Sequence, residues 1–516
     1  LLVESTKRGE RKTDQGCALV PPRRGALTPP LPAHYPVPGS LSSPGGGALQ
    51  KTWVRSLIVA VLSVLPWLGG LSVEELAWEG DYLVGDNPLL DAPDVWTRAF
   101  TLPWAAGVGH PHGAAKNRGY YRPVATLDLA LEKHLWGDDP RGWRVGALVL
   151  HGGQAVALLR VLELAAAGPA AAVLAVAWAW HPLHSEVIGS VAYRTTALTA
   201  LLGLLALGLL ARRRGRDPTR LVGGLLLVAL GFFTKETAVT FLVVIPLGLL
   251  ALDPGPEGRR RAGQVALGLV LLAGLYWLAR SGVVEPSPGA VLEHLALGER
   301  MALMTKAVAV HVGIILWPVR LNPHYDISLF YPPLVDGRTA AGLVVLAGVA
   351  VLGAVGLLRR RAWAFALLAA VAVLGPVSGI VPLRVIAADR FLVLPLALAL
   401  LAGLLGWRDR GRPWPRAGMR RVALLVVAAL ALSGLGVRSW TRMEDWRSFR
   451  GLLEARVRDF PRSVDAQLGL GHVCLLEGDL SCSREHLDAA LEIYPGYPMA
   501  EAIRAELEIA ERGSGP

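Results

Sequence analysis

The amino-acid sequence predicts an all-α membrane protein with about eleven transmembrane helices and a small helical tail. Of its 516 residues, 53% are hydrophobic. These residues gather in long, nearly uncharged runs, and a membrane span needs roughly 20 apolar residues. Arginines cluster between the runs, as the positive-inside rule expects. The clearest runs are Ser56–Val73, Thr195–Ala211, Ala262–Ala279, Ala340–Leu358, Ala362–Val381 and Val422–Val437.

The chain divides into three predicted parts. Residues 1–53 are rich in Pro, Gly and basic residues without periodicity, so we expect a disordered, basic cytoplasmic tail. Residues 54–440 hold the predicted spans, and the first, Ser56–Val73, lacks a small-residue cleavage site, which indicates an anchor rather than a signal peptide. The positive-inside rule explains the net charge of +11 without nucleic-acid binding.

Four basic clusters set the predicted topology, because all four are expected in the cytoplasm. This parity makes residues 74–142 the first outer loop and puts the C-terminal tail outside. It also predicts that Met301–Pro318 does not cross, since a crossing there would invert everything after it. Its embedded Lys306 and His311 instead suggest a helix packed against protein. The clusters are Arg212–Arg220, Arg259–Arg261, Arg359–Arg361 and Arg408–Arg421.

The tail, residues 441–516, is charged and soluble in character. Its segment Val464–Pro495 fits one tetratricopeptide unit, whereas Arg456 departs from the pattern just before it. A single unit cannot bury its own face, so we expect the tail to dock on the membrane domain, on a partner or on a second copy. The sequence leaves a Cys474–Cys482 disulfide open. The residues at repeat offsets are Leu470, Gly471, Ser483, Leu487, Ala490 and Pro495.

Ionisable residues near membrane segments are expensive and therefore mark candidate sites. The predicted topology places a mixed set of acids and bases on the outer face. Arg122 and Arg194 suit a phosphate, because a planar guanidinium binds anions with two donors. The candidates are Glu79, Asp81, Arg122, His184, Glu186, Arg194, Lys235, Glu236, Tyr325, Asp389 and Arg390.

Each candidate group also has a plainer interpretation. His181-Pro-Leu-His184-Ser-Glu186 has metal-like spacing, but a hydrogen-bonded helix end explains it at least as well, and we assign no metal ligand there. The pairs Lys235–Glu236 and Asp389–Arg390 are either local ion pairs or parts of a site. The acidic stretch Glu79–Asp86 could be a solvated loop.

Taken in order along the chain, these motifs resemble the GT-C glycosyltransferases, specifically the transmembrane and tetratricopeptide-repeat protein O-mannosyltransferases and their bacterial relatives. The similarity runs from about Ser56 to the C-terminus. It rests on Trp78–Pro88 (WEGDYLVGDNP), Tyr121-Arg122-Pro123, His151, the His181-Pro182-x-His184-x-Glu186…Arg194 stretch, Lys235-Glu236, Trp317-Pro318 with Tyr325, Asp389-Arg390 and the repeat tail.

The resemblance implies transfer of a sugar, mannose or a similar hexose, from a polyprenyl-phosphate carrier to a protein or glycan acceptor. The family usually has paired aspartates in the first loop, where this chain has Glu79-Gly80 followed by Asp81. Glu79 would then be the catalytic base, with Asp81 as the second candidate. The other nine candidates would bind the donor phosphate or shape the pocket. No cofactor is implied, and a divalent metal is not excluded.

Two other function classes compete with a transferase. A transporter would place its charges near the membrane midplane, whereas here they cluster at one face. An inactive scaffold would only present the repeat tail to a protein partner, and the Glu79-Gly80 departure keeps this reading open. The Ala- and Arg-rich composition suggests a bacterial inner membrane, with the active face and the C-terminus in the periplasm. A eukaryotic origin would instead place them in the lumen of the endoplasmic reticulum.

Overall fold

A computed structural model describes residues 46–108, 119–166, 168–212, 217–284, 294–330, 332–380, 385–411 and 418–513. These residues fold into helices and connecting turns, and the β-type pairing seen among them is one isolated antiparallel bridge between Tyr325 and Ala387. The all-α prediction is confirmed. The residues from Thr52 onward form one compact unit. Most of the predicted N-terminal tail, residues 1–45, lies outside the described residues.

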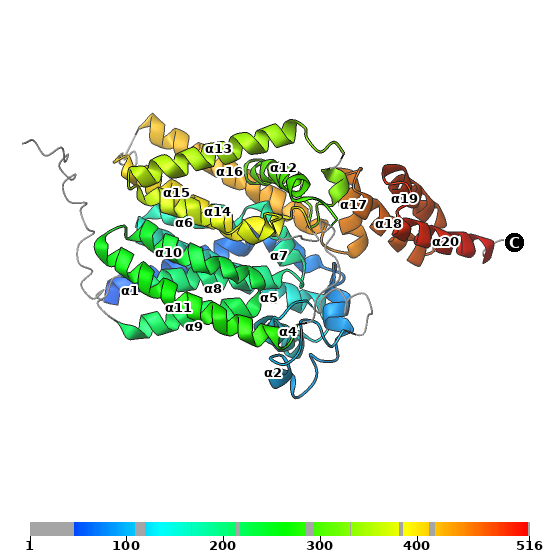
Figure 1. The fold of residues 1–516 in the computed structure, drawn as a ribbon, viewed down its shortest axis with the longest axis horizontal. Coiled ribbons are helices and arrows are strands. Elements are labelled where there is room, and N and C mark those ends of the chain that lie inside the picture. Colours follow the sequence, from blue (N-terminus) through cyan, green and yellow to red (C-terminus); the bar gives the residue numbers. More distant parts are fainter. Residues whose placement is uncertain are drawn as a thin grey trace, which may run out of the picture. The chain divides into compact units, whose positions relative to one another are not determined.

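The α-helices follow one another with short connections, and Figure 1 shows α17–α20 beyond one end of the other long helices. The α-helices are α1 Gly46–Val64, α2 Val95–Arg98, α4 Pro123–Trp136, α5 Pro140–Ala165, α6 Pro169–Ala179, α7 Ser185–Gly189, α8 Arg194–Leu210, α9 Pro218–Thr234, α10 Phe241–Leu252, α11 Pro256–Ser281, α12 Leu297–Leu316, α13 Gly337–Leu358, α14 Ala362–Ala372, α15 Val393–Asp409, α16 Met419–Glu444, α17 Phe449–Asp459, α18 Val464–Leu476, α19 Leu480–Ile493 and α20 Pro498–Gly513.

Shorter helical segments of three to eight residues extend or break these helices. They are η1 Leu65–Ser72, η2 Asp81–Gly85, η3 Pro182–His184, η4 Glu236–Thr240, η5 Ile327–Leu329, η6 Gly375–Val377 and η7 Asp389–Leu392; η2 is a π-turn and the others are 3-10 turns. Four of them, η2, η3, η4 and η7, carry predicted site residues.

Helix starts follow from local sequence. Five helices of the bundle (α4, α5, α6, α9 and α11) begin with proline, whose missing N–H costs nothing in the first turn. Asp139 and Asp217 precede two of these prolines, and each accepts a hydrogen bond from a first-turn amide. Such caps accept hydrogen bonds from first-turn backbone N–H groups, which have no acceptor within the helix.

Among the described residues, six helical segments are long and apolar enough to cross a membrane. A bent pair, Pro182–Gly189 with Arg194–Leu210 at 115°, would make a seventh. This supports membrane character and gives fewer spans than the predicted eleven, because α6, α9, α10 and α14 have only 11 to 17 residues. The six are Thr52–Ser72, Pro140–Ala165, Pro256–Ser281, Gly337–Leu358, Asp389–Asp409 and Val422–Glu444.

Helix α12 is not among the six, and its polar residues are buried against protein as predicted. The Lys306 ammonium donates to the Phe330 carbonyl over 2.8 Å and lies 3.2 Å from an Asp336 carboxylate oxygen. The His311 ring is 6% exposed.

The helix ends with predicted cytoplasmic arginines meet at one end of the bundle. Arg408 on α15 donates to the Ala165 carbonyl at the end of α5 over 2.6 Å. Arg55 on α1 pairs with Glu163 on α5, also at 2.6 Å. The ends of α1, α5 and α15 that carry these residues are therefore neighbours in space.

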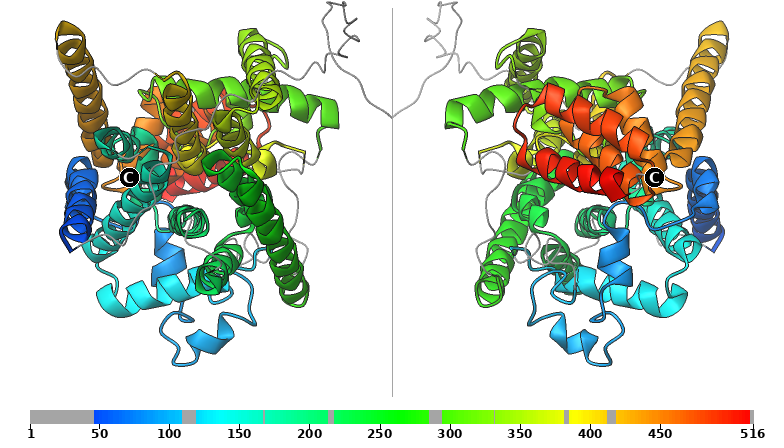
Figure 2. Two further views of the ribbon diagram at one scale, coloured as in Figure 1. Left: turned by 90° about the vertical axis from the view of Figure 1, so that its left-hand side faces the viewer. Right: turned by 90° about the vertical axis from the view of Figure 1, so that its right-hand side faces the viewer.

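The tail forms consecutive helix pairs with their own small cores. Leu487 and Ala490 of α19 pack with Leu468 of α18 and with Leu507 of α20. Gly471 lets the pair α18–α19 approach closely, since a Cβ there would lie 3.0 Å from the Leu487 side chain. The right-hand view of Figure 2 shows α18–α20, in red, covering part of the bundle end.

Candidate functional site

A buried ion pair joins two turns that are far apart in sequence. The Glu186 carboxylate on α7 accepts the backbone N–H of Arg390 on η7 over 2.7 Å and also pairs with its guanidinium. That guanidinium donates to the Pro323 carbonyl over 2.8 Å and stacks 3.9 Å from the Tyr193 ring centroid. Both residues were predicted site members, but their pairing was not predicted.

Tyr325 and Asp389 meet beside this pair. The Tyr325 hydroxyl lies 3.2 Å from an Asp389 carboxylate oxygen, and the Tyr325 N–H donates to the Ala387 carbonyl over 3.1 Å. Burial raises the pKa of Tyr325 well above its ordinary value, so the hydroxyl keeps its proton and can donate. The structure thus brings four predicted residues into one cluster.

Glu79 sits on a strained turn next to this cluster. The backbones of Trp78 and Glu79 have φ of 57° and 65°, the left-handed region that disfavours residues with a Cβ. Glu79 is half-buried and lies within electrostatic range of Arg390 and Tyr193. Asp81 starts the π-turn η2, but its side chain lies outside the described residues.

Lys235 and Glu236 have separate partners. The Lys235 ammonium donates to the Thr196 hydroxyl over 2.5 Å, while the Glu236 carboxylate accepts from Arg122 over 2.8 to 3.2 Å. Burial, reinforced by Arg122 and Arg390, lowers the pKa of Lys235 to about 7. With such a pKa, Lys235 is only partly protonated near pH 7, and a bound anionic ligand would favour its charged form.

A small cavity of about 50 Å³ opens between Lys235 and Arg390. Its remaining lining is of two chemical kinds. Four residues carry hydroxyls and six are apolar: Thr196, Thr199, Thr237 and Thr240, and Ala200, Phe241, Val373, Val377, Phe391 and Leu394. Such a lining suits a ligand with an anionic end and an apolar chain.

Arg122 and Arg194 are engaged by carboxylates. The Arg122 guanidinium pairs with Glu236 and stacks 4.4 Å from the Tyr120 ring centroid. Arg194 contacts Asp128 at 2.6 Å and Glu132 at 2.5 Å. The two acids were not predicted, although their spacing of four residues on α4 places them on one helix face and could have drawn attention to them.

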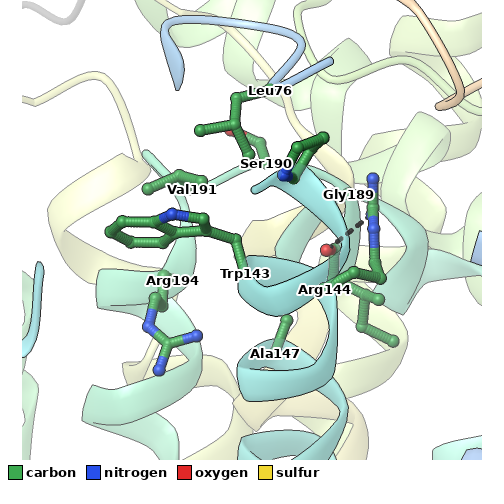
Figure 3. Close-up of a pocket in the computed structure, with 10 residues that line it drawn as sticks. Leu76, Trp143, Arg144, Ala147, Gly189, Ser190, Val191 and Arg194 are labelled. Carbon is green, nitrogen blue, oxygen red and sulfur yellow. Dashed lines mark hydrogen bonds between the residues drawn. The ribbon is translucent and has the colours of Figure 1, made fainter. Parts of the chain in front are cut away.

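Arg194 also lines a second, smaller cavity of about 10 Å³, shown in Figure 3. There the Arg144 guanidinium donates to the Ile188 carbonyl over 2.7 Å. This cavity is smaller than the first by a factor of about five in volume. Arg194 therefore braces α4 against α8, outside the cavity that Arg390 lines.

His184 is buried in an aromatic cluster. Its ring centroid lies 4.2 Å from that of Trp178 and 4.9 Å from that of His151. Across the described part of the chain, no three His, Cys, Asp or Glu side chains are grouped as metal ligands. His184 therefore contacts aromatic rings, two residues before the Glu186 that pairs with Arg390.

Comparison of the sequence with protein-family models and with curated proteins finds no match in either.

Proposed function

We propose that this protein is an integral membrane glycosyltransferase of the GT-C type, which moves a hexose such as mannose from a polyprenyl-phosphate carrier to a protein or glycan acceptor. The cavity between Lys235 and Arg390 carries this proposal. It joins two cations and four hydroxyl-bearing residues to an apolar wall. The cations and hydroxyls suit the phosphate of such a carrier, and the apolar residues suit its lipid chain.

Each part of the site would carry out one step of the sugar transfer. The acceptor hydroxyl oxygen attacks the anomeric carbon while its proton passes to the Glu79 carboxylate. The bond from the anomeric carbon to the phosphate oxygen breaks, and its electron pair leaves with the polyprenyl phosphate. Lys235 and Arg390 stabilise that growing negative charge. Asp81 is the second candidate for the base.

The proposed topology has eleven spans with the site and the tail on the outer face, the periplasm in a bacterium. Eleven segments support it: α1 with η1, α5, α6, α8, α9, α10, α11, α13, α14, α15 and α16 coincide with the eleven predicted crossings. The neighbouring positions of the arginine-bearing ends agree with this arrangement. We further propose that α18 and α19 form a tetratricopeptide unit.

The test is sugar transfer by membranes that contain the protein, compared with membranes of a deletion strain. The readout is loss of labelled hexose from polyprenyl phosphate and its gain on protein or glycan. Glu79→Gln should abolish transfer, and Lys235→Gln should raise the donor KM. Arg338→Gln, an exposed residue at the start of α13, is the matched control.

Equal transfer with and without the protein, across several donor sugars, would contradict the proposal. Activity that survives Glu79→Gln but not Asp81→Asn would keep the transferase and move the base to Asp81. Uptake of a labelled solute by vesicles, without transfer, would favour a transporter.

A further inference from the structure

The tail is anchored on the outer loops by a buried arginine. The Arg456 side chain on α17 is 1% exposed. Its guanidinium donates to the Asn322 side-chain oxygen over 2.9 Å and to Asp465 over 2.6 Å. Burial opposes ionisation of Asp465, but Arg456 and His324 outweigh it and hold the pKa of that carboxyl below its ordinary range.

This residue is the one that departs from the repeat pattern, and its chemistry explains why. Burying a charge is expensive unless its partners are well placed, so a hydrophobic residue would suffice for helix packing alone. A guanidinium can bind oxygens at its edge while its face stacks on an aromatic ring. Arg456 does both, since its guanidinium carbon lies 5.0 Å from the Trp78 ring centroid.

Trp78 links the tail to the candidate site. One of its contacts comes from the tail's Phe449, at 6.2 Å between ring centroids. The indole N–H donates to the Tyr193 hydroxyl, and the Trp78 carbonyl accepts from Ser190 over 3.2 Å. Tyr193 in turn stacks on Arg390. A continuous chain of contacts therefore runs from Arg456 through Trp78 and Tyr193 to Arg390.

The contacted turn is also the strained one. Trp78 and Glu79 hold left-handed backbone angles, and such angles persist only where the surroundings enforce them. The segment before the turn is fixed by the tail connection as well, because the Glu74 N–H donates to the Arg447 carbonyl over 2.9 Å.

We propose that Arg456 is a positioning residue: through it the docked tail holds the Trp78–Glu79 turn against Arg390. The consequence for turnover rests on the proposed function, but the effect on the turn does not. Without Arg456, Glu79 would sample many orientations, while the donor cavity at Lys235 would keep its lining.

The experiment combines hydrogen exchange of the full-length protein in detergent with transfer kinetics. Arg456→Met should speed amide exchange in residues 74–83 by roughly tenfold, the order expected for losing one buried cation–π contact. The Leu83 amide, which donates to the Glu79 carbonyl over 3.1 Å, reports on the turn directly. The kcat should fall by a similar factor, with the donor KM within about twofold of wild type.

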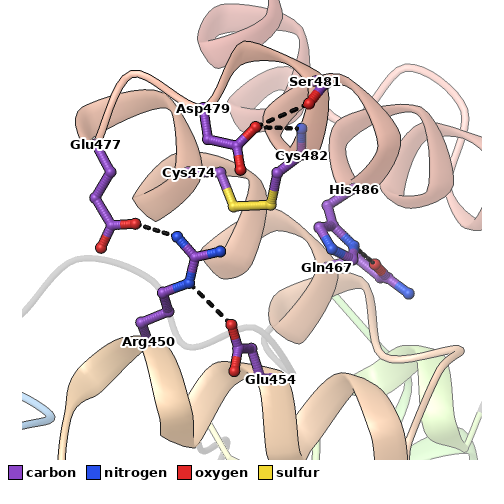
Figure 4. The surroundings of a disulfide bond; sticks show 9 residues. All are labelled: Arg450, Glu454, Gln467, Cys474, Glu477, Asp479, Ser481, Cys482 and His486. Atoms are coloured by element: carbon purple, nitrogen blue, oxygen red, sulfur yellow. Dashed lines mark hydrogen bonds and ion pairs between the residues drawn. A yellow bond between two sulfur atoms is a disulfide. The ribbon is translucent and has the colours of Figure 1, made fainter.

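The matched control is Arg450→Met, which makes the same change on the same helix. Arg450 pairs with Glu454 and Glu477 at the tail surface, as Figure 4 shows, and its side chain is 36% exposed. This variant should exchange and turn over like wild type. Arg456→Lys keeps the charge but loses the planar fork, so it should fall between wild type and Arg456→Met.

Unchanged exchange at residues 74–83 in Arg456→Met would overturn the proposal. If that variant instead loosens the whole tail, Trp78→Leu decides, because it leaves the Asn322 and Asp465 contacts of Arg456 in place; normal exchange of the turn in Trp78→Leu would also overturn it. A wild-type protein that transfers no sugar refutes the proposed function alone, since the exchange result stands by itself.

Discussion

The two ends of the helix bundle use the same residue type for different purposes. At the end that carries Arg359–Arg361, Arg361 is 42% exposed and lies 4.0 Å from Asp409, whose side chain is 8% exposed. At the other end, Arg390 is 8% exposed and pairs with a Glu186 that is fully buried. Pairs with an exposed member contribute about 0 to 1 kcal/mol, whereas fully buried pairs carry a large desolvation cost. The exposed Arg361 guanidinium can remain hydrated, whereas the buried Arg390 guanidinium depends on Glu186.

The comparison fails if the two ends do not lie on opposite sides of a membrane. Two positions at opposite ends of α13 test this: Arg338, 43% exposed, and Leu358, 84% exposed. In a variant without native cysteines, Arg338→Cys in intact cells should react with an impermeant maleimide. Leu358→Cys should react only after the membrane is opened, because Arg359–Arg361 hold that end inside. Equal labelling of both in intact cells would contradict the topology.

Breaking the Glu186–Arg390 pair should have the largest effect on stability. Glu186→Gln leaves the Arg390 guanidinium buried without its counter-charge, which destabilises by about 3–5 kcal/mol in comparable sites. Thermal unfolding of purified protein in detergent should show a clear fall in Tm. Arg361→Gln at the other end is the control and should cost less than about 1 kcal/mol. An unchanged Tm in Glu186→Gln would show that water reaches the pair.

The sequence was sufficient where the signal is local. Long apolar runs such as Ala340–Leu358 and Val422–Val437 fall within helices that are long enough to cross a membrane. The sequence was insufficient where two interacting residues lie far apart along the chain. Glu186 and Arg390 were both candidates, but nothing local states that they meet across 204 positions. Pairing at that range is decided by packing of the whole bundle.

Two further residues, Asp128 and Arg456, show the same limit of prediction from the sequence. Asp128 was not a candidate, because the spacing of Asp128 and Glu132 on α4 was not considered, yet it binds Arg194. Arg456 was noticed only as an exception to the repeat pattern, and the structure supplies its partners. Of the three docking options for the tail, the structure shows the membrane domain, through Asn322 and Trp78.

A smaller effect should come from pH at Lys235. Its pKa of about 7 means that the free protein loses this cation as pH rises from 6 to 8. Binding of an anionic polyprenyl phosphate, measured by titration of detergent-solubilised protein, should weaken by up to roughly tenfold over that range. Lys235→Arg keeps its charge and should flatten the profile. A profile equally steep in Lys235→Arg would assign the titration to another group.

The smallest effect is expected at the tail surface. Arg484 pairs with Glu511, and its side chain is 49% exposed. Arg484→Gln should change the free energy of unfolding by less than about 0.5 kcal/mol, as for other exposed pairs, measured by resistance of the tail to proteolysis in denaturant. Transfer activity should not change. A loss above about 1 kcal/mol would mean that this pair is not simply solvated, and the contrast between exposed and buried charges would then have to be redrawn for the tail.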